Sequence, residues 1–196
     1  MAPRDPEATK ARIFAAATAE FAAHGIAGAR IDRIAREAKA NKQLIYAYFG
    51  DKAELFAQVL QHALGGLAAA VPVDAEEPDG YVDRLMDYHQ AHPELLRLLL
   101  WEGLEYGPAT GIPLEEERRA HYQAKAENFA AAQERGTIRR DVPPQDLVFM
   151  ISALAGWSTA APQLRRMLVG DTDEDLARLR GSVRTAARRL TGSDGS

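Results

Sequence analysis

The chain has 196 residues, of which 46% are hydrophobic and 27% are charged, and its net charge at neutral pH is -4. This composition is typical of a globular protein of one or two domains, and the negative charge argues against a uniformly basic nucleic-acid binder. The absence of cysteine excludes disulfides and thiolate metal sites and suits a cytoplasmic protein. We expect no membrane partner, because the N-terminus lacks the apolar run of a signal peptide and no apolar stretch is long enough to span a bilayer.

The charge is divided unevenly along the chain. Residues 1–52 carry nine Lys and Arg against six Asp and Glu, a net charge of +3, so the remainder carries -7. A mildly basic N-terminal part followed by an acidic remainder favours an N-terminal module that faces an anion.

The first expected helix has a start signal and a stop signal. Asp5 can cap it, Pro6 occupies its first helical position, and Gly25 can supply the left-handed residue that ends it. The apolar residues then predict two short helices, over 31–38 and 42–49, with a break of about three residues between them.

A longer helix is expected after these two. Gly50 ends the second short helix, and Asp51 opens the longer one with Glu54 at the capping-box position. An acidic, turn-rich linker at 71–80 is the expected domain boundary. Further helices are expected at 80–91, 93–106, 114–135, 145–168 and 173–190. The sequence therefore predicts an all-α fold.

Two short helices behind a longer one are typical of a helix-turn-helix in a three-helix frame. The second short helix of such a module lies in the DNA major groove, held by its predecessor, and its outer side contacts bases and phosphates. In the helix at 42–49, Ile45 and Phe49 are one turn apart and are expected to point into the core. The side chains then left to face DNA are Lys42, Gln43, Leu44, Tyr46 and Tyr48.

The chemistry of these side chains suits a DNA surface. Gln43 can pair in bidentate fashion with adenine, and Leu44 can contact a thymine methyl group or, alternatively, belong to the core. Lys42, Tyr46 and Tyr48 can reach phosphates or base edges, although an ordinary solvated helix face would also place the tyrosines there.

Two residues that flank this helix extend the candidate surface. Asn41 can cap the helix and touch a phosphate. Lys52 lies at the start of the next helix, where free backbone N–H groups already favour an anion, although a solvated position is the simpler alternative.

The segment RIDRIAREAKANKQLIYAYFGDKAEL resembles the DNA-binding signature of TetR-family transcriptional repressors. The resemblance covers roughly residues 8–60 in detail, and beyond them it rests on length and helical layout. The positions that match the signature in register are Ile34, Ala35, Ala38, Tyr46, Phe49 and Lys52. The resemblance implies that Asn41, Lys42, Gln43, Tyr46, Tyr48 and Lys52 contact DNA.

Two positions depart from the family pattern. Lys39 stands in the turn where Gly is usual, so either it adopts a left-handed conformation, at a cost on the order of 1 kcal/mol, or the turn differs. Arg30 stands at the start of the second helix where Thr is frequent, and it can make a phosphate or minor-groove contact that Thr cannot.

The resemblance also implies an organisation and a function. The expected protein is a homodimeric transcriptional regulator, a repressor, which binds a palindromic double-stranded DNA operator and responds to a small-molecule effector. Its last two long helices, at 145–168 and 173–190, would pair with their copies in a four-helix bundle. The expected parts are a helix-turn-helix domain at 1–52, a connecting helix at 53–70, a ligand-binding and dimerisation domain at 71–191, and a disordered tail at 192–196.

The C-terminal domain offers candidates for the effector pocket. At helical spacing, aromatic and methionine residues are also ordinary core residues, so both interpretations stay open. The candidates are Met86, Trp101, Tyr106, Tyr122, Phe129, Met150 and Trp157. His89, His92 and His121 permit a metal hypothesis, but no metal-binding signature spacing is present and solvated or hydrogen-bonded histidines are the simpler interpretation. We expect no metal and no cofactor.

Two other functional classes remain as alternatives. The first is an α-helical ligand-binding or protein-interaction domain that keeps a helix-turn-helix shape without specific DNA binding. The second is an enzyme, although neither a nucleophile–base pairing nor a phosphate-binding loop can be argued from residue spacing.

Overall fold

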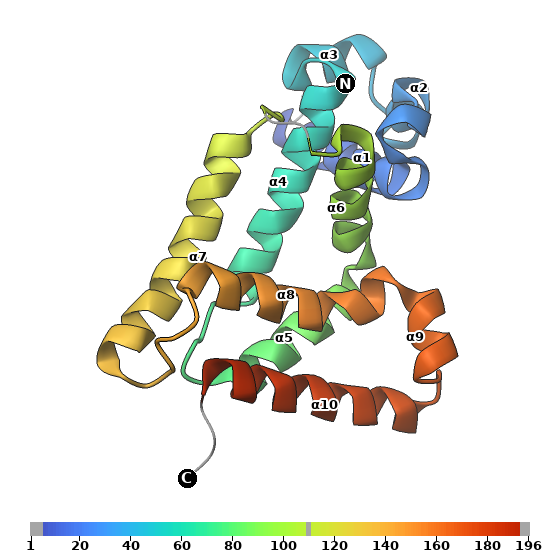
Figure 1. Cartoon of the computed structure of the whole chain (residues 1–196). Coiled ribbons are helices and arrows are strands. Elements are labelled where there is room, and N and C mark those ends of the chain that lie inside the picture. The colour runs from blue at the N-terminus through green and yellow to red at the C-terminus, as the bar shows by residue number, and fades with distance from the viewer. Residues whose placement is uncertain (1–5, 109–110, 193–196) are drawn as a thin grey trace. The chain divides into compact units, whose positions relative to one another are not determined.

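The computed structural model describes residues 6–108 and 111–192, and within these ranges every regular element is an α-helix (Figure 1). The prediction of an all-α fold is confirmed. The helices are α1 (Pro6–Gly28), α2 (Ile31–Glu37), α3 (Lys42–Phe49), α4 (Lys52–Ala70), α5 (Pro78–Ala91), α6 (Pro93–Tyr106), α7 (Glu115–Arg135), α8 (Pro144–Ala160), α9 (Pro162–Leu168) and α10 (Asp173–Thr191). The predicted cap at Asp5 and residues 193–196 of the predicted tail lie outside the described residues.

These helices belong to two compact units. The first unit comprises residues 1–66 and 94–115, and the second comprises residues 67–93 and 116–196. Most of α6 therefore packs with the N-terminal helices, although its sequence lies within the expected C-terminal domain. The boundaries of the functional domains stay a prediction.

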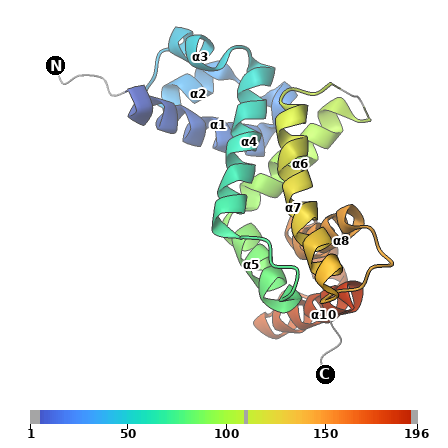
Figure 2. The same cartoon turned by 90° about the vertical axis from the view of Figure 1, so that its left-hand side faces the viewer.

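In the first unit, α1, α2 and α3 share a core with the first turns of α4 (Figure 2). Phe14 meets Phe49 edge to face with ring centroids 5.1 Å apart, and Phe21 meets Phe56 in the same way at 5.2 Å. Ile45 is fully buried. Because Ile45 and Phe49 both point into this core, as predicted, the opposite side of α3 is left to solvent.

Gly25 does not end the first helix as predicted, but it does break it. The residue has φ 69° and ψ -179°, and helical turns continue beyond it to Gly28. Helix α6 is anchored at this break, because Arg97 Nε and Trp101 Nε1 both donate to the carbonyl oxygen of Ala22, at 2.7 and 3.2 Å. Trp101 thus has a structural partner within the first unit.

The start of α4 has the predicted capping box. Asp51 Oδ1 accepts hydrogen bonds from the backbone N–H groups of Ala53 and Glu54, at 2.8 and 2.9 Å. In return, the Glu54 carboxylate accepts from the backbone N–H of Asp51 at 2.8 Å. These bonds satisfy N–H groups that a helix start leaves without partners, and they fix where α4 begins.

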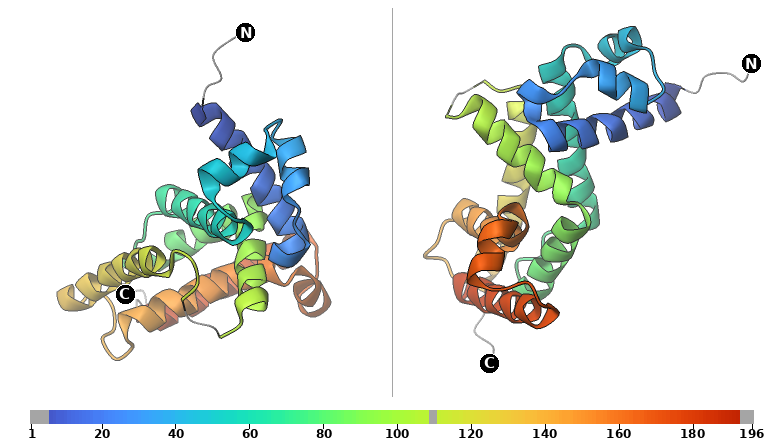
Figure 3. Two further views of the ribbon diagram at one scale, coloured as in Figure 1. Left: turned by 90° about the horizontal axis from the view of Figure 1, so that it is seen from above. Right: turned by 90° about the vertical axis from the view of Figure 1, so that its right-hand side faces the viewer.

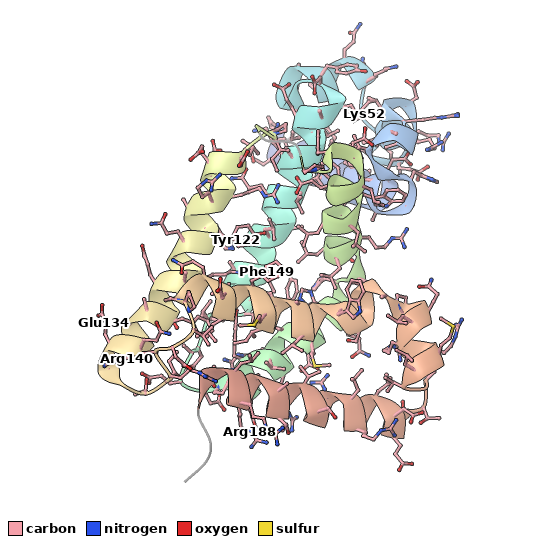
Figure 4. All side chains as sticks on the ribbon, viewed as in Figure 1. Lys52, Tyr122, Glu134, Arg140, Phe149 and Arg188 are labelled. Atoms are coloured by element: carbon pink, nitrogen blue, oxygen red, sulfur yellow. The ribbon has the colours of Figure 1, made fainter. Side chains whose placement is uncertain are left out.

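In the second unit, α10 packs against α5 and α8. Arginines one turn apart on α10 pair with aspartates one turn apart on α5. Arg184 Nε donates to Asp83 Oδ1 at 2.9 Å, and Arg180 Nη2 donates to Asp87 Oδ1 at 2.5 Å. Arg188, labelled in Figure 4, extends this series toward the C-terminal end of α10.

The predicted continuous helix over 145–168 is wrong. The chain forms α8 and α9, which are bent by 86° at Ala161, and Figure 1 and the right panel of Figure 3 show this corner. Pro162 lacks a backbone N–H and excludes the helical conformation from the residue before it, so Ala161 has φ -123° and ψ 63°. Within the described ranges, no single helix is long and apolar enough to cross a membrane. Among the described helices, only α8 and α9 taken together, as a bent pair, reach the required length and apolar character.

Candidate nucleic-acid interface

Helix α2 is fixed to α1 by a largely buried carboxylate. Glu20 accepts hydrogen bonds from Arg33 Nε at 2.7 Å and from the backbone N–H of Arg30 at 2.8 Å. Burial alone raises the pKa of Glu20, but the bonds from Arg33 and from Arg30 outweigh it, so the pKa lies below its usual range. The anionic carboxylate therefore holds the first residues of α2 while the Arg30 side chain stays exposed.

Helix α3 presents one polar face to solvent. Asn41 caps it as predicted, because its Oδ1 accepts from the backbone N–H of Gln43 at 2.8 Å. Lys42, Gln43 and Tyr46 are exposed, the last with 45% of its surface accessible. Leu44 is half-buried, so it contributes to both the core and the outer face.

Tyr48 lies at the edge of this face. It is half-buried, and Lys10 Nζ of α1 lies 5.5 Å from the centre of its ring. This cation–π contact places a positive charge beside the phenol. The edge of the α3 face therefore combines an aromatic ring with a cation from a different helix.

Lys42 has a partner on α2 that the residue pattern does not predict. Its ammonium lies 2.9 Å from Asp32 Oδ1 on α2, and both side chains are well exposed. The hydrogen bond with Asp32 raises the pKa of Lys42. The two residues are ten positions apart and meet only because the turn brings α2 and α3 together. A signal for this pair is therefore absent from the residue pattern.

Lys52 lies at the first residue of α4 (Figure 4) and also has protein partners. Its ammonium donates to the carbonyl oxygens of Ala27 and Ala29, at 3.3 and 3.5 Å. These bonds tie α4 to the end of α1. Of the eight residues predicted to contact DNA, five lie on α3, Arg30 and Asn41 are the cap residues of α2 and α3, and Lys52 is the first residue of α4.

The structure does not bring the seven pocket candidates together. Trp101 and Tyr106 belong to the first unit and the other five to the second. Met150 and Trp157 line an apolar groove of about 580 Å³ formed by α8, α9 and α10, and Met86 lines a different depression with α10 residues. Phe129 is buried against Tyr81, with ring centroids 6.5 Å apart. Tyr122 is exposed on α7.

The three histidines of the metal hypothesis lie in different surroundings. His89 is buried, its Nδ1 has no hydrogen-bond partner, and burial lowers its pKa to about 4. The ring of His92 lies tilted by 36° against that of Tyr88, with centroids 4.4 Å apart, and the ring of His121 meets that of Tyr122 edge to face at 5.6 Å. Across the described ranges, these and the other possible ligands form no group of three that could hold a metal ion.

Comparison with known sequences connects both units to one family. The sequence profile of the bacterial regulatory proteins of the tetR family matches residues 13–59, and the profile of the tetracyclin repressor-like C-terminal domain matches residues 77–189. The chain belongs to the TetR family of transcriptional regulators. The N-terminal match contains α2 and α3 in full.

Individual relatives agree with this assignment. The transcriptional repressor SCO4008 of Streptomyces coelicolor is 59% identical over 190 residues, which are 97% of this chain and 98% of the relative. The repressor NicS of Pseudomonas putida is 35% identical over half of each chain. The crystal structure of SCO4942 from Streptomyces coelicolor superposes with a TM-score of 0.79 at 32% identity, covering 93% of this chain and 97% of the other. The TetR-family chain is thus a DNA-binding transcriptional regulator.

Proposed function

We propose that this TetR-family regulator is a cytoplasmic repressor that binds a palindromic operator as a homodimer and releases it when a small molecule binds the C-terminal domain. The observation that carries the proposal is the two-sided character of α3. Ile45 and Phe49 are buried in the core, while Lys42, Gln43 and Tyr46 face solvent from one short helix. Such a helix fits the major groove and can present its polar side to base edges.

Some of the exposed residues would contact bases and read the sequence, and others would contact phosphates and position the helix. Gln43 can make two hydrogen bonds to adenine, and Leu44 can contact a thymine methyl group. Tyr46, Tyr48 and Arg30 would contact the phosphate backbone, as would Asn41 from the helix cap. These contacts fix the register of the helix on the duplex and carry no sequence information themselves.

The roles of Lys42 and Lys52 would differ from those of free surface lysines. Lys42 would exchange its contact with Asp32 for a phosphate or a base edge. Lys52 already donates to two carbonyl oxygens at the end of α1, which holds its ammonium in a fixed position from which it would contact a phosphate.

Dimer formation would use α8 and α10, with α9 at the edge of the interface. Phe149 on α8 is 75% exposed, Trp157 two turns later is 57% exposed, and Leu168 on α9 is 76% exposed. Figure 4 shows Phe149 on α8. Large apolar side chains gathered on one exposed face are typical of a protein interface. A second copy of the chain is the natural occupant, because a palindromic operator requires two recognition helices related by a two-fold axis.

Repression would be relieved through linkage between the two ligands. An effector that favours a conformation in which the recognition helices no longer match the half-sites must lower the affinity for DNA. By the same thermodynamic cycle, DNA must lower the affinity for the effector.

The test measures binding of the purified protein to DNA from upstream of its own gene by fluorescence anisotropy, with scrambled DNA as competitor. Tyr46→Ala and Lys52→Ala should each weaken specific binding at least tenfold, while Arg119→Ala, which removes an exposed cation on α7, should leave it unchanged. Thermal unfolding of each variant separates lost contacts from lost stability. Unchanged binding by both interface variants would refute the site assignment. Failure of the parent protein to prefer its own upstream DNA would refute specific operator binding at that site.

A further inference from the structure

The turn between α2 and α3 contains a residue in an unfavourable backbone conformation. The backbone N–H of Ala40 donates to Ala35 O at 2.9 Å, and that of Lys39 donates to Arg36 O at 3.1 Å. This pair of bonds is the Schellman ending of a helix, in which the residue in the position of Lys39 is left-handed and is usually glycine. Lys39 accordingly has φ 50°.

Nothing in the local structure favours a lysine in this position. Left-handed backbone is costly for a residue with a Cβ, and lysine lacks the short polar side chain by which Asn or Asp offsets that cost. In the described ranges, Leu114 is the other non-glycine residue with positive φ, and its side chain is half-buried. The Lys39 side chain is exposed. Packing therefore does not compensate for its conformation.

The charge of Lys39 also has no partner among the residues that the structure describes. Other cations around the turn are engaged: Lys42 with Asp32, Lys52 with two carbonyl oxygens, and Arg33 with Glu20. Arg12 Nε donates to Ala38 O at 3.2 Å, directly before the turn. Over the part of the chain that the structure describes, no ion pair or side-chain hydrogen bond engages Lys39.

We propose that Lys39 binds a phosphate of the DNA backbone beside the recognition helix, and that this contact is the reason a lysine occupies a position suited to glycine. The inference rests on the proposed operator binding and adds a residue to it. Lys39 lies two residues before Asn41, the cap of α3, and three before Lys42, so it is an exposed residue at the same end of the helix as Lys42. Strained residues held in an exposed segment beside a binding surface are typical of functional sites.

Lys39 and Lys42 would enter the complex differently. Lys42 must leave Asp32 before it can contact DNA, whereas the Lys39 ammonium has no bond to any described residue that would first have to break. When a lysine binds a DNA phosphate, it releases a counterion from the DNA and so strengthens binding at low salt. For Lys39 this gain is not reduced by the loss of an ion pair with any described residue.

The experiment compares Lys39→Gly with the parent protein in two measurements that should move in opposite directions. The melting temperature should rise by about 2–4 °C, because glycine removes the left-handed strain. The affinity for operator DNA should fall. A dimer contributes two such lysines, so the slope of log K against log salt should lose roughly 1.8, which is ~60-fold in affinity at 0.1 M salt and little at 1 M.

Further variants separate charge from backbone conformation. Lys39→Arg should retain the affinity, since it keeps the charge, and Lys39→Asn should lose the affinity while tolerating the turn. If the parent binds its operator and Lys39→Gly binds with the same salt slope, the inference is wrong even though the proposed function stands. Weaker binding with an unchanged slope would also overturn it, since that result indicates a structural role. If the parent itself shows no specific binding, the proposed function fails first.

Discussion

The break at Gly25 makes a measurable prediction about how α6 is anchored to α1. Gly25 has φ 69° and ψ -179°, a region occupied almost only by glycine. A Cβ placed there would lie 2.7 Å from Cε3 of Trp101 and 2.8 Å from Cδ2. Trp101 cannot easily move away, because its indole N–H is bonded to Ala22 O. Gly25→Ala therefore combines backbone strain with a steric clash against a fixed ring.

The two effects can be given magnitudes. Backbone strain in this region costs about 1–3 kcal/mol, and overpacking of a rigid neighbour costs about 1–3 kcal/mol more. The free energy of unfolding should thus fall by roughly 2–6 kcal/mol, a large part of the ~5–15 kcal/mol typical of a native protein. The matched control is Gly65→Ala in α4, where the added Cβ would meet no described atom within 4 Å apart from the neighbouring backbone of its own helix. Alanine should stabilise the helix there by about 0.5–1 kcal/mol.

The assay is equilibrium unfolding in urea followed by circular dichroism, with thermal melts as a second measurement. Gly25→Ala should lower the midpoint strongly and Gly65→Ala should raise it slightly. The double variant Gly25→Ala, Trp101→Leu separates the clash from the strain, because leucine removes the ring that the methyl group would meet. If Gly25→Ala and Gly65→Ala shift the midpoint in the same direction by similar amounts, the reasoning is refuted.

Three further predictions follow from the interface and from the second unit. Asp32→Asn should free Lys42 and raise the affinity for DNA, most strongly at low salt, in the same anisotropy titration; a lower affinity would mean that the pair orients Lys42 for binding. Burial holds the pKa of His89 near 4 in the folded protein against about 6.5 when unfolded, so the unfolded state binds more protons between these values. Stability should therefore fall as the pH drops from about 6.5 to 4, and His89→Leu should flatten that dependence in urea titrations; an equally steep fall in the variant would contradict the assignment. The double variant Phe149→Asp, Trp157→Asp should be a monomer in sedimentation velocity and should lose operator binding. If the double variant remains a dimer and binds DNA with unchanged affinity, the dimer interface lies elsewhere.

The sequence alone determined most of the helical architecture of this TetR-family regulator, because the signals involved are local. Capping boxes, prolines at helix starts and apolar spacing act within a few residues, so the start of α4 at Asp51 and Lys52 and the cap at Asn41 were predicted correctly. The inward orientation of Ile45 and Phe49 followed from the same spacing.

Pro162 and Gly25 are local signals whose effect on the tertiary structure does not follow from the sequence. Pro162 was visible in the sequence, yet whether the chain kinks or turns there depends on which neighbours the two helices find, and the outcome is the 86° bend between α8 and α9. Gly25 is predicted to end the first helix, yet it breaks the helix instead, and Trp101 and Arg97, more than seventy residues away, bind at that break.

Only the tertiary structure decided how the charged groups of the interface are used. No residue pattern encodes the distances between helices that produce the Lys42–Asp32 pair and the bonds of Lys52 to two carbonyl oxygens. The same distances leave Lys39 without a side-chain partner among the described residues. Local backbone chemistry specifies where helices begin and end, because its interactions reach only one or two turns. The partners of a long charged side chain are chosen by whichever segments the folded core brings within about 3 Å of it, and that choice requires the whole module.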